Sequence, residues 1–247
     1  MIPLKSEKDL RMIKQSAEIL AKVMRQLERT ISEGVLTREI DALAEKLVLA
    51  QNALPAFKGY KGFPATVCTS VNEEIVHGIP SERRLKEGDI LGLDLGVNYN
   101  GYFSDAAVTL PIGRVPVRVK KLVEVARKAL SEGIKEARPG NHLLDISAAI
   151  QRCVESNGFS VVRQFVGHGI GLNLHEEPEI PNFGQPHHGP LLEKGMVLAI
   201  EPMVNMGGWE AEILDNGWTA VTRDRMPSAH FEHTIAITEK GPEILTA

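Results

Sequence analysis

The chain has 247 residues, of which 43% are hydrophobic and 24% are charged, an ordinary globular composition that can bury a substantial core. The formal net charge of -4 argues against a dedicated nucleic-acid or anionic-membrane surface, which would need clustered Lys and Arg. The first residues lack the basic start and apolar run of a secretory signal, and no apolar stretch of about 18 residues occurs that could span a membrane.

Two helices are predicted first along the chain. Apolar residues recur every three or four positions over 7–31, with Ser6 as N-cap and Asp9 three residues on. A second helix is predicted from Thr37 as its N-cap, with an inward face of Ile40, Leu43, Leu47 and Val48. Short β-rich runs then follow at Ala65 to Val71, Glu74 to His77, Asp89 to Gly96, and Ala106 to Pro111.

The same order of elements then returns. A third helix is marked by Val119, Leu122, Val123, Ala126 and Leu130. A fourth helix is marked by Leu143, Ile146, Ile150, Cys153 and Val154. The second set of β-rich runs lies at Ser160 to Val166, Met196 to Val204, Trp218 to Thr222, and Glu232 to Thr238.

The repeated order indicates an internal duplication. Gly140 follows Gly34 by 106 residues (140 − 34), and each precedes an isoleucine by six. Glu201 follows Asp94 by 107 residues (201 − 94) within two similar segments. Leu-x-x-Gly turns before strands are common and could give this match by chance. We instead expect a single catalytic domain over 1–247, with two similar α/β halves, approximately 1–112 and 113–247, that share one mixed or antiparallel sheet covered by helices on its outer face.

The duplication pairs two acidic residues, Asp94 and Glu201, that both sit in apolar strands. Side chains alternate along a strand, so the leucines next to Asp94 face the helices and its carboxylate faces the other way. A buried carboxylate is costly unless a cation neutralises it. Two such carboxylates on one inner face therefore predict a bound metal, although either one alone would also suit a solvated strand edge.

Three more metal-ligand candidates accompany this pair. Asp105 is joined to the strand of Asp94 by Asn98 to Gly101, a typical hairpin turn. Glu232 opens the last long strand, and His168 lies between glycines that allow close backbone approach. The glycine run lacks the spacing of a dinucleotide site. Four carboxylates and one imidazole favour two divalent ions such as Mn, Fe or Co over one tetrahedral zinc, and such a pair activates water for hydrolysis.

The two cysteines, Cys68 and Cys153, lie far apart in the sequence. Two cysteines do not make a disulfide framework. We therefore expect reduced thiols and a cytoplasmic location.

Over essentially its whole length the chain resembles the type I methionine aminopeptidases. The motifs that carry this resemblance are Val67-Cys-Thr-Ser-Val-Asn-Glu-Glu-Ile-Val-His77-Gly-Ile-Pro, Gly167-His-Gly-Ile-Gly171 with His175-Glu-Glu-Pro, Ile200-Glu-Pro-Met-Val-Asn205, Asp215-Asn-Gly-Trp218-Thr, and Glu232-His-Thr-Ile. It implies the pita-bread fold, an α+β fold with two pseudo-symmetric halves around a curved, largely antiparallel sheet. It also implies removal of the N-terminal methionine from nascent proteins and peptides, with a metal-bridging water as the attacking group.

The resemblance also assigns roles to residues. Asp94, Asp105, His168, Glu201 and Glu232 match the ligands of two divalent metal ions, with Asp105 and Glu232 bridging both ions. Glu201 also matches the acceptor of the proton of the attacking water. His77 matches a contact to the scissile amide, and His175 matches a group that steadies the tetrahedral intermediate. Tyr60, Phe63, Cys68 and Trp218 match the lining of the methionine pocket, which His77 and His175 adjoin.

Other interpretations of these residues stay open. His77 and His175 could be structural, and the aromatic residues could belong to the core. We interpret the remaining histidines as parts of exposed loops: His142, His187, His188, His230 and His233.

The sequence departs from the family pattern at four positions. Gly96 and Ala106 stand where many members carry threonine, and we expect the lost hydroxyls to alter the surroundings of the metals. Leu174 stands where an aromatic residue is common, and Phe57 where a smaller residue is common. These changes leave the shape of the pocket open.

Two rival functions deserve comparison. A proline-specific peptidase of the same superfamily generally carries an extra N-terminal domain, whereas here the first helix is expected near residue 7. A metal-free binding protein on this fold would typically have lost ligands, and all five candidates are present. We further expect a monomer without membrane or nucleic-acid partners. We expect no zinc-binding or basic N-terminal extension, so any ribosome contact would use the catalytic domain's own surface.

Overall fold

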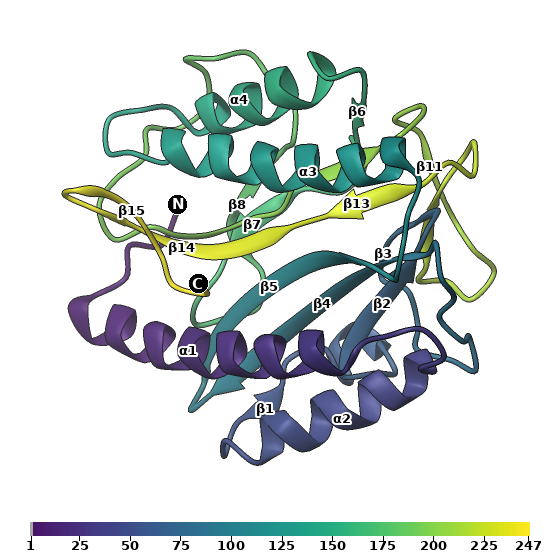
Figure 1. Ribbon diagram of the computed structural model, residues 1–247. Helices are drawn as coiled ribbons and strands as arrows, with labels where there is room; N and C mark the ends of the chain where they lie inside the picture. Colours follow the sequence, from purple (N-terminus) through teal and green to yellow (C-terminus); the bar gives the residue numbers. More distant parts are fainter. Residues whose placement is uncertain (1) are drawn as a thin grey trace.

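The computed structural model describes residues 2–247, in which pairs of helices alternate with groups of strands (Figure 1). The helices within this range are α1 (Glu7–Thr30), α2 (Thr37–Leu49), α3 (Val117–Glu136) and α4 (Leu143–Glu155), with a short 3₁₀ turn η1 (Tyr60–Gly62). None of them combines the length and apolarity that crossing a bilayer would need.

One curved antiparallel sheet runs through both halves of the molecule. Its strands follow the order β1-β4-β5-β14-β9-β7-β8, with β2 beside β4 and β15 beside β14. Their bounds are β1 (Leu54–Pro55), β2 (Val67–Val71), β4 (Ile90–Tyr99), β5 (Tyr102–Pro111), β7 (Gly167–Gly169), β8 (Glu176–Ile180), β9 (Val197–Ile200), β14 (Glu232–Thr238) and β15 (Gly241–Ile244). Two smaller sheets comprise β6 (Ser160–Val161) with β10 (Met203–Asn205) and β13 (Ser228–His230), and β3 (Glu74–Val76) with β11 (Ala211–Ile213) and β12 (Ala220–Thr222).

The helices cover the outer face of this sheet, as predicted. Figure 1 shows α1 and α2 against the half that contains β4 and β5, and α3 and α4 against the half that contains β14. Leu91, Leu93 and Leu95 are fully buried in a core with α1 and α2, whereas Asp94 points to the opposite face. Burial of such leucines contributes about 1.5–3 kcal/mol each, and alternation therefore directs the acidic residue inward.

The two halves repeat the same local bonds at matching positions. Gly34 N–H donates to the Leu85 carbonyl (2.8 Å), and Gly140 N–H donates to the Leu192 carbonyl (3.0 Å). Both glycines have a positive φ, and each leads into a helix whose N-cap amide binds an acidic side chain. The predicted division into halves 1–112 and 113–247 stays a prediction, which these repeated bonds support.

Most predicted elements are present, with shifts at their ends. The capping box of α1 is confirmed, because Ser6 N–H donates to Asp9 Oδ2 (3.0 Å) and Asp9 N–H to Ser6 Oγ (3.2 Å). The predicted cap of α2 is wrong by one residue: Thr37 is already helical and Leu36 is the N-cap. The hairpin turn contains only Asn100 and Gly101, both with positive φ, so β4 and β5 extend further toward it than predicted.

In the second set of predicted strands, three are shorter or interrupted. The run Ser160 to Val166 is strand only at Ser160–Val161, and Met196 to Val204 is broken at Glu201 and Pro202. A proline has no amide hydrogen for the ladder, so the break frees Glu201 from regular pairing. Trp218 lies in the turn before β12.

Candidate metal centre and active site

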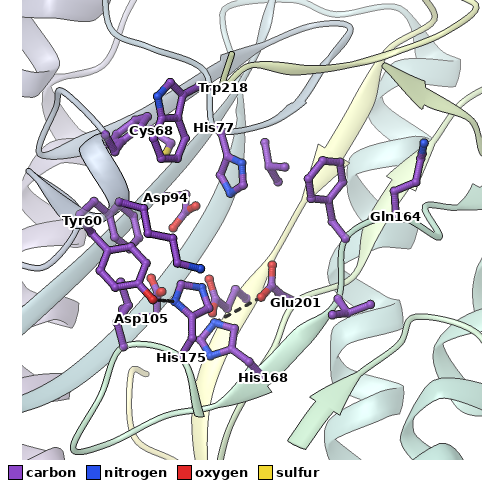
Figure 2. Close-up of a pocket in the computed structure, with 18 residues that line it drawn as sticks. Tyr60, Cys68, His77, Asp94, Asp105, Gln164, His168, His175, Glu201 and Trp218 are labelled. Carbon is purple, nitrogen blue, oxygen red and sulfur yellow. Dashed lines mark hydrogen bonds and ion pairs between the residues drawn. The ribbon is translucent and has the colours of Figure 1, made fainter. Parts of the chain in front are cut away.

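A cavity of about 360 Å³ opens on the inner face of the sheet. Figure 2 shows side chains from both halves of the chain pointing into it. Every candidate that the sequence singled out for catalysis, substrate binding or metal binding lines this cavity: Tyr60, Phe63, Cys68, His77, Asp94, Asp105, His168, His175, Glu201, Trp218 and Glu232.

The first half contributes its two aspartates from one hairpin. In the β4–β5 ladder Asp94 lies opposite Ala107, and Asp105 lies opposite Gly96. The two aspartates are therefore diagonal neighbours on the cleft face. Asp105 N–H also donates to Thr234 Oγ1 on β14 (2.9 Å), which holds the hairpin against the second half.

The second half contributes Glu201, Glu232 and His168 from three adjacent strands. Ligand atoms of Asp105, His168 and Glu232 lie within 4.8 Å of one another, and His168 Nε2 lies 3.5 Å from Glu201 Oε1. The Nδ1 atom of His168 is 2.8 Å from the Gly169 carbonyl. A proton on Nδ1 leaves the lone pair of Nε2 facing the carboxylates, as a metal ligand requires.

The glycines around His168 are required by close backbone packing. A Cβ added to Gly169 would lie 2.1 Å from the Glu177 carbonyl oxygen, and one added to Gly167 would lie 2.5 Å from that of Ala199. Because β7 runs between β8 and β9, these glycines let His168 reach the cavity. The close backbone approach predicted for this glycine run is confirmed, and the role of His168 as a metal ligand stays a prediction.

The electrostatics of this site fit divalent cations. One carboxylate oxygen each of Asp94, Asp105 and Glu232 is buried and has no hydrogen-bond partner among residues 2–247. Burial raises the pKa of Asp94 and of Glu201 to about 7 and the pKa of Asp105 and of Glu232 well above the usual range. Unpaired buried carboxylates cost free energy, and a bound cation removes that cost. Four carboxylates with one imidazole suit metals that accept oxygen ligands.

An aromatic pocket adjoins the carboxylates. Phe63 and Trp218 meet edge to face at 5.1 Å between ring centroids, and both pack with Cys68. Burial raises the pKa of the Cys68 thiol well above its ordinary value, so the thiol is neutral and lines the pocket as an apolar group. Cys68 and Cys153 are both buried and form no disulfide within the described chain.

Two histidines flank the carboxylates. His77 follows β3 with a φ of 60°, a strained conformation that costs a non-glycine residue about 1–3 kcal/mol. Burial lowers the pKa of His77 to about 4, so its ring is neutral at pH 7. His175 lies at the mouth of the cavity, where its Nδ1 is 3.0 Å from the Tyr60 hydroxyl and its ring is 4.2 Å from that of His168.

Three of the histidines assigned to exposed loops are placed differently. His230 is buried at the end of β13, with its Nε2 3.5 Å from Glu201 Oε2. His233 belongs to β14, and its Nδ1 lies 2.9 Å from Thr246 Oγ1. His142 is the partly buried N-cap of α4. The exposure predicted for His187 and His188 is confirmed.

Gly96 and Ala106, the two positions where many family members carry threonine, lie on opposite faces of the sheet. Gly96 lies on the cleft face opposite Asp105, as expected. Ala106 instead packs in the core beneath α1 and α2, so the expectation of an effect near the metals is wrong there. Consecutive strand residues face opposite sides, and Asp105 already takes the cleft side.

Among the residues near the site that sequence reasoning missed are His230 and Phe165. His230 precedes Glu232 by two positions, a spacing that places side chains on one face of an extended chain and could have revealed it. Phe165 meets the ring of His77 edge to face at 5.6 Å. No local pattern points to Phe165, because the segment that carries it is irregular between β6 and β7.

Comparison with known proteins agrees with this geometry. A family model described as metallopeptidase family M24 matches residues 11–239. Methionine aminopeptidase 1 of Bacillus subtilis is 50% identical over 246 residues, which cover 100% of this chain and 99% of that protein.

Solved structures agree as well. A methionine aminopeptidase crystal structure from Thermotoga maritima superposes with a TM-score of 0.98 at 46% identity, covering 100% of this chain and 99% of that chain. A prolidase from Pyrococcus furiosus superposes with a TM-score of 0.81 at 25% identity, and the match covers 99% of this chain but 65% of that chain. The curved sheet is thus the pita-bread fold shared by both kinds of peptidase. With its convergent acidic residues and its match over nearly the whole length, the chain belongs to metallopeptidase family M24 and is a metal-dependent hydrolase.

Proposed function

We propose that this protein is a methionine aminopeptidase that releases the N-terminal methionine of proteins and peptides. The observation that carries the proposal is one cavity in which an oxygen-rich metal centre adjoins a pocket of Phe63, Trp218 and a neutral Cys68 thiol. A thioether packs well against aromatic edges, and a flexible unbranched side chain fits such a lining. The full-length similarity to proteins named methionine aminopeptidase supports this choice.

Two divalent ions, of the cobalt, manganese or iron type, suit the ligand set of the cavity. Asp94, Asp105, His168, Glu201 and Glu232 would hold them, and Asp105 and Glu232 are the two residues proposed to contact both ions. When bound, such ions polarise the scissile carbonyl and lower the pKa of water toward neutrality. This assignment is supported by the buried carboxylate oxygens that have no hydrogen-bond partner among residues 2–247.

Glu201 is the proposed acceptor of the proton of the attacking water. It follows β9 at the point where the ladder breaks, so its carboxylate projects into the cavity between two strands. A pKa of about 7 suits a group that must accept a proton and release it near neutral pH. The Nε2 atoms of His168 and His230 each lie 3.5 Å from a different oxygen of this carboxylate, and a proton on His230 Nε2 would help to orient it.

His77 and His175 are proposed to act on the scissile amide. His77 is neutral and faces the cavity beside Trp218, where its ring can hydrogen-bond the amide. His175 is held by the Tyr60 hydroxyl, and a proton on its Nε2 can stabilise the charge that develops on the carbonyl oxygen. Tyr60 thus orients His175 as well as lining the pocket.

We infer that the substrates are the N-termini of new polypeptides, which places the reaction in the cytoplasm, near or at the ribosome. A monomer suffices for this activity, because every proposed site residue comes from a single chain. Neither nucleic acid nor membrane is required as a substrate.

Hydrolysis of two peptides tests the proposed function. Met-Ala-Ser and Ala-Pro-Ser are incubated with the metal-free protein, with and without added Mn²⁺ or Co²⁺. We expect metal-dependent release of methionine alone, and its loss in Asp105→Asn. Cleavage of Ala-Pro-Ser alone would assign the protein to the proline-specific branch that the prolidase likeness represents. Cleavage of neither peptide with any metal would favour a binding protein.

A further inference from the structure

Gly96 and Phe57 share one space on the cleft face of β4. Gly96 follows Asp94 by two residues, so a side chain at position 96 would point to the cavity side of the sheet. A Cβ added to Gly96 would lie 2.6 Å from Phe57 Cε1 and 3.0 Å from Ala56 Cβ. The ring of Phe57 therefore occupies the volume that any side chain at position 96 would need. Phe57 and Gly96, two of the positions that depart from the family pattern, are therefore neighbours in space.

The backbone on either side fixes the ring in this place. Leu54 and Pro55 of β1 pair with Asn98 and Val97 of β4. The Ala56 N–H donates to the Gly96 carbonyl (2.9 Å) and extends that ladder by one residue. On the other side, the Tyr60 N–H donates to the Phe57 carbonyl (2.9 Å) and starts the η1 turn. The ring is thus placed by bonds that would have to break before the backbone of Phe57 could retreat.

The other edge of the ring forms part of the cavity wall. Phe57 packs with the pocket cluster of Phe63, Cys68 and Trp218, and also with the cluster that contains Leu174 and Tyr60. It therefore joins the proposed methionine pocket to the cavity mouth, next to the strand that carries Asp94.

We propose that Phe57 is a specificity-determining residue that limits the room for the N-terminal side chain, and that Gly96 is the partner that allows its ring to lie there. This inference rests on the proposed function. Removing the ring opens space above the bare backbone of Gly96, which continues into the pocket. Adding a side chain at 96 has the opposite effect, because it displaces the ring into the cavity.

Phe57→Ala tests the first half of the proposal through substrate choice. We expect the kcat/KM ratio for Phe-Ala-Ser over Met-Ala-Ser to rise about 10-fold or more, the usual size of a pocket effect. Metal stoichiometry, measured by calorimetry, should stay unchanged. An unchanged ratio in a variant that binds metal normally would overturn the assignment of Phe57.

A double-mutant cycle tests the dependence on Gly96. Gly96→Ala should lower kcat/KM for Met-Ala-Ser about 10-fold in the natural protein and less than about 2-fold in Phe57→Ala, because the clashing ring is gone. Gly92→Ala is the matched control: it lies on the same face of β4, and its added Cβ would meet Ser70 at an ordinary 3.4 Å. Equal effects of Gly96→Ala in both backgrounds would overturn the coupling.

Thermal unfolding keeps the two proposals distinguishable. Gly96→Ala should lower the Tm by about 2–10 °C in the natural protein through overpacking, and the added Phe57→Ala should cancel most of that loss relative to Phe57→Ala alone. If the natural protein releases no methionine, the proposed function fails, yet this unfolding cycle still decides whether the two positions share one space. If Gly96→Ala does not fold, recovery of the folded state in the double variant supports the coupling, and its absence contradicts it.

Discussion

Glu201 lies between two imidazoles, each 3.5 Å from a different oxygen of its carboxylate. His168 reaches it from β7, and His230 reaches it from the end of β13. His230 Nε2 is buried and has no hydrogen-bond partner within 2–247, and burial lowers the pKa of this ring. A neutral imidazole with a proton on Nε2 can orient the carboxylate without competing for the metals.

His230→Ala should therefore lower metal affinity or kcat about 10–100-fold, the usual effect of removing a group that orients a ligand. The measurements are calorimetric titration with Mn²⁺ and turnover of Met-Ala-Ser. His233→Ala is the matched control, because that ring binds Thr246 and does not line the cavity. Equal losses in both variants would show that the effect is structural.

Metal loading should release protons. Burial raises the pKa of Asp94 and of Glu201 to about 7, whereas a metal ligand must be ionised. The protonated form therefore prevails below pH 7, so proton release per ion should grow and apparent affinity should fall from pH 8 to pH 6. Calorimetry with Mn²⁺ in two buffers of different ionisation enthalpy measures the release, and buffer-independent heats at pH 6 would contradict it.

Among the elements, β7 is tightly constrained, because it is only three residues long and runs between two other strands. Its two glycines lie so close to neighbouring carbonyl oxygens that a Cβ at either position would clash with them. The position of His168 is thus decided by the packing of backbones rather than by contacts of the imidazole itself.

Gly169→Ala should separate β7 from β8 and either prevent folding or abolish metal binding, because its Cβ would meet the Glu177 carbonyl oxygen at 2.1 Å. Circular dichroism and metal titration measure the two outcomes. Gly184→Ala serves as control: the nearest atom to its Cβ would belong to the flexible side chain of Leu144, at 3.3 Å, and Gly184 lies outside the cavity. Normal metal binding in Gly169→Ala would refute this explanation of the glycine run.

At the scale of the whole molecule, the acidic residues lie where the two halves of the chain meet. Asp94 and Asp105 come from β4 and β5, whereas Glu201 and Glu232 come from the second half. The strands that meet there, β5 and β14, pair over only two positions, Glu232 with Ala107 and His233 with Ala106. A cation held by the proposed ligands of both sides would therefore tie the halves together.

Removal of bound metal should weaken the contact between the two halves. At about 100 times its Kd a bound ligand stabilises the fold by about 2.7 kcal/mol, so chelation should lower the Tm by roughly 5–10 °C. Calorimetric scans with and without EDTA measure the change. The double variant Asp105→Asn with Glu232→Gln is the control, because it loses ligands and should not respond to EDTA. An unchanged Tm in the natural protein would contradict a metal that bridges the halves.

The sequence by itself determined the elements whose signals are local. Periodicity located the four α-helices described over 2–247, and strand alternation sent Asp94 to the cleft face and its leucines to the core. The turn residues from Asn98 to Gly101 marked the hairpin that carries two aspartates. These signals are reliable because backbone geometry over a few residues sets which way each side chain points.

Only the tertiary structure decided which distant residues meet. His230 lies beside Glu201 because β10 and β13 pair across a gap of more than twenty residues, and no periodicity encodes that pairing. The same holds for Phe57 over Gly96, a contact made by the pairing of β1 with β4. The sequence thus specified the chemical groups of the site, and sheet register decided their neighbours, because register is the outcome of packing the whole chain at once.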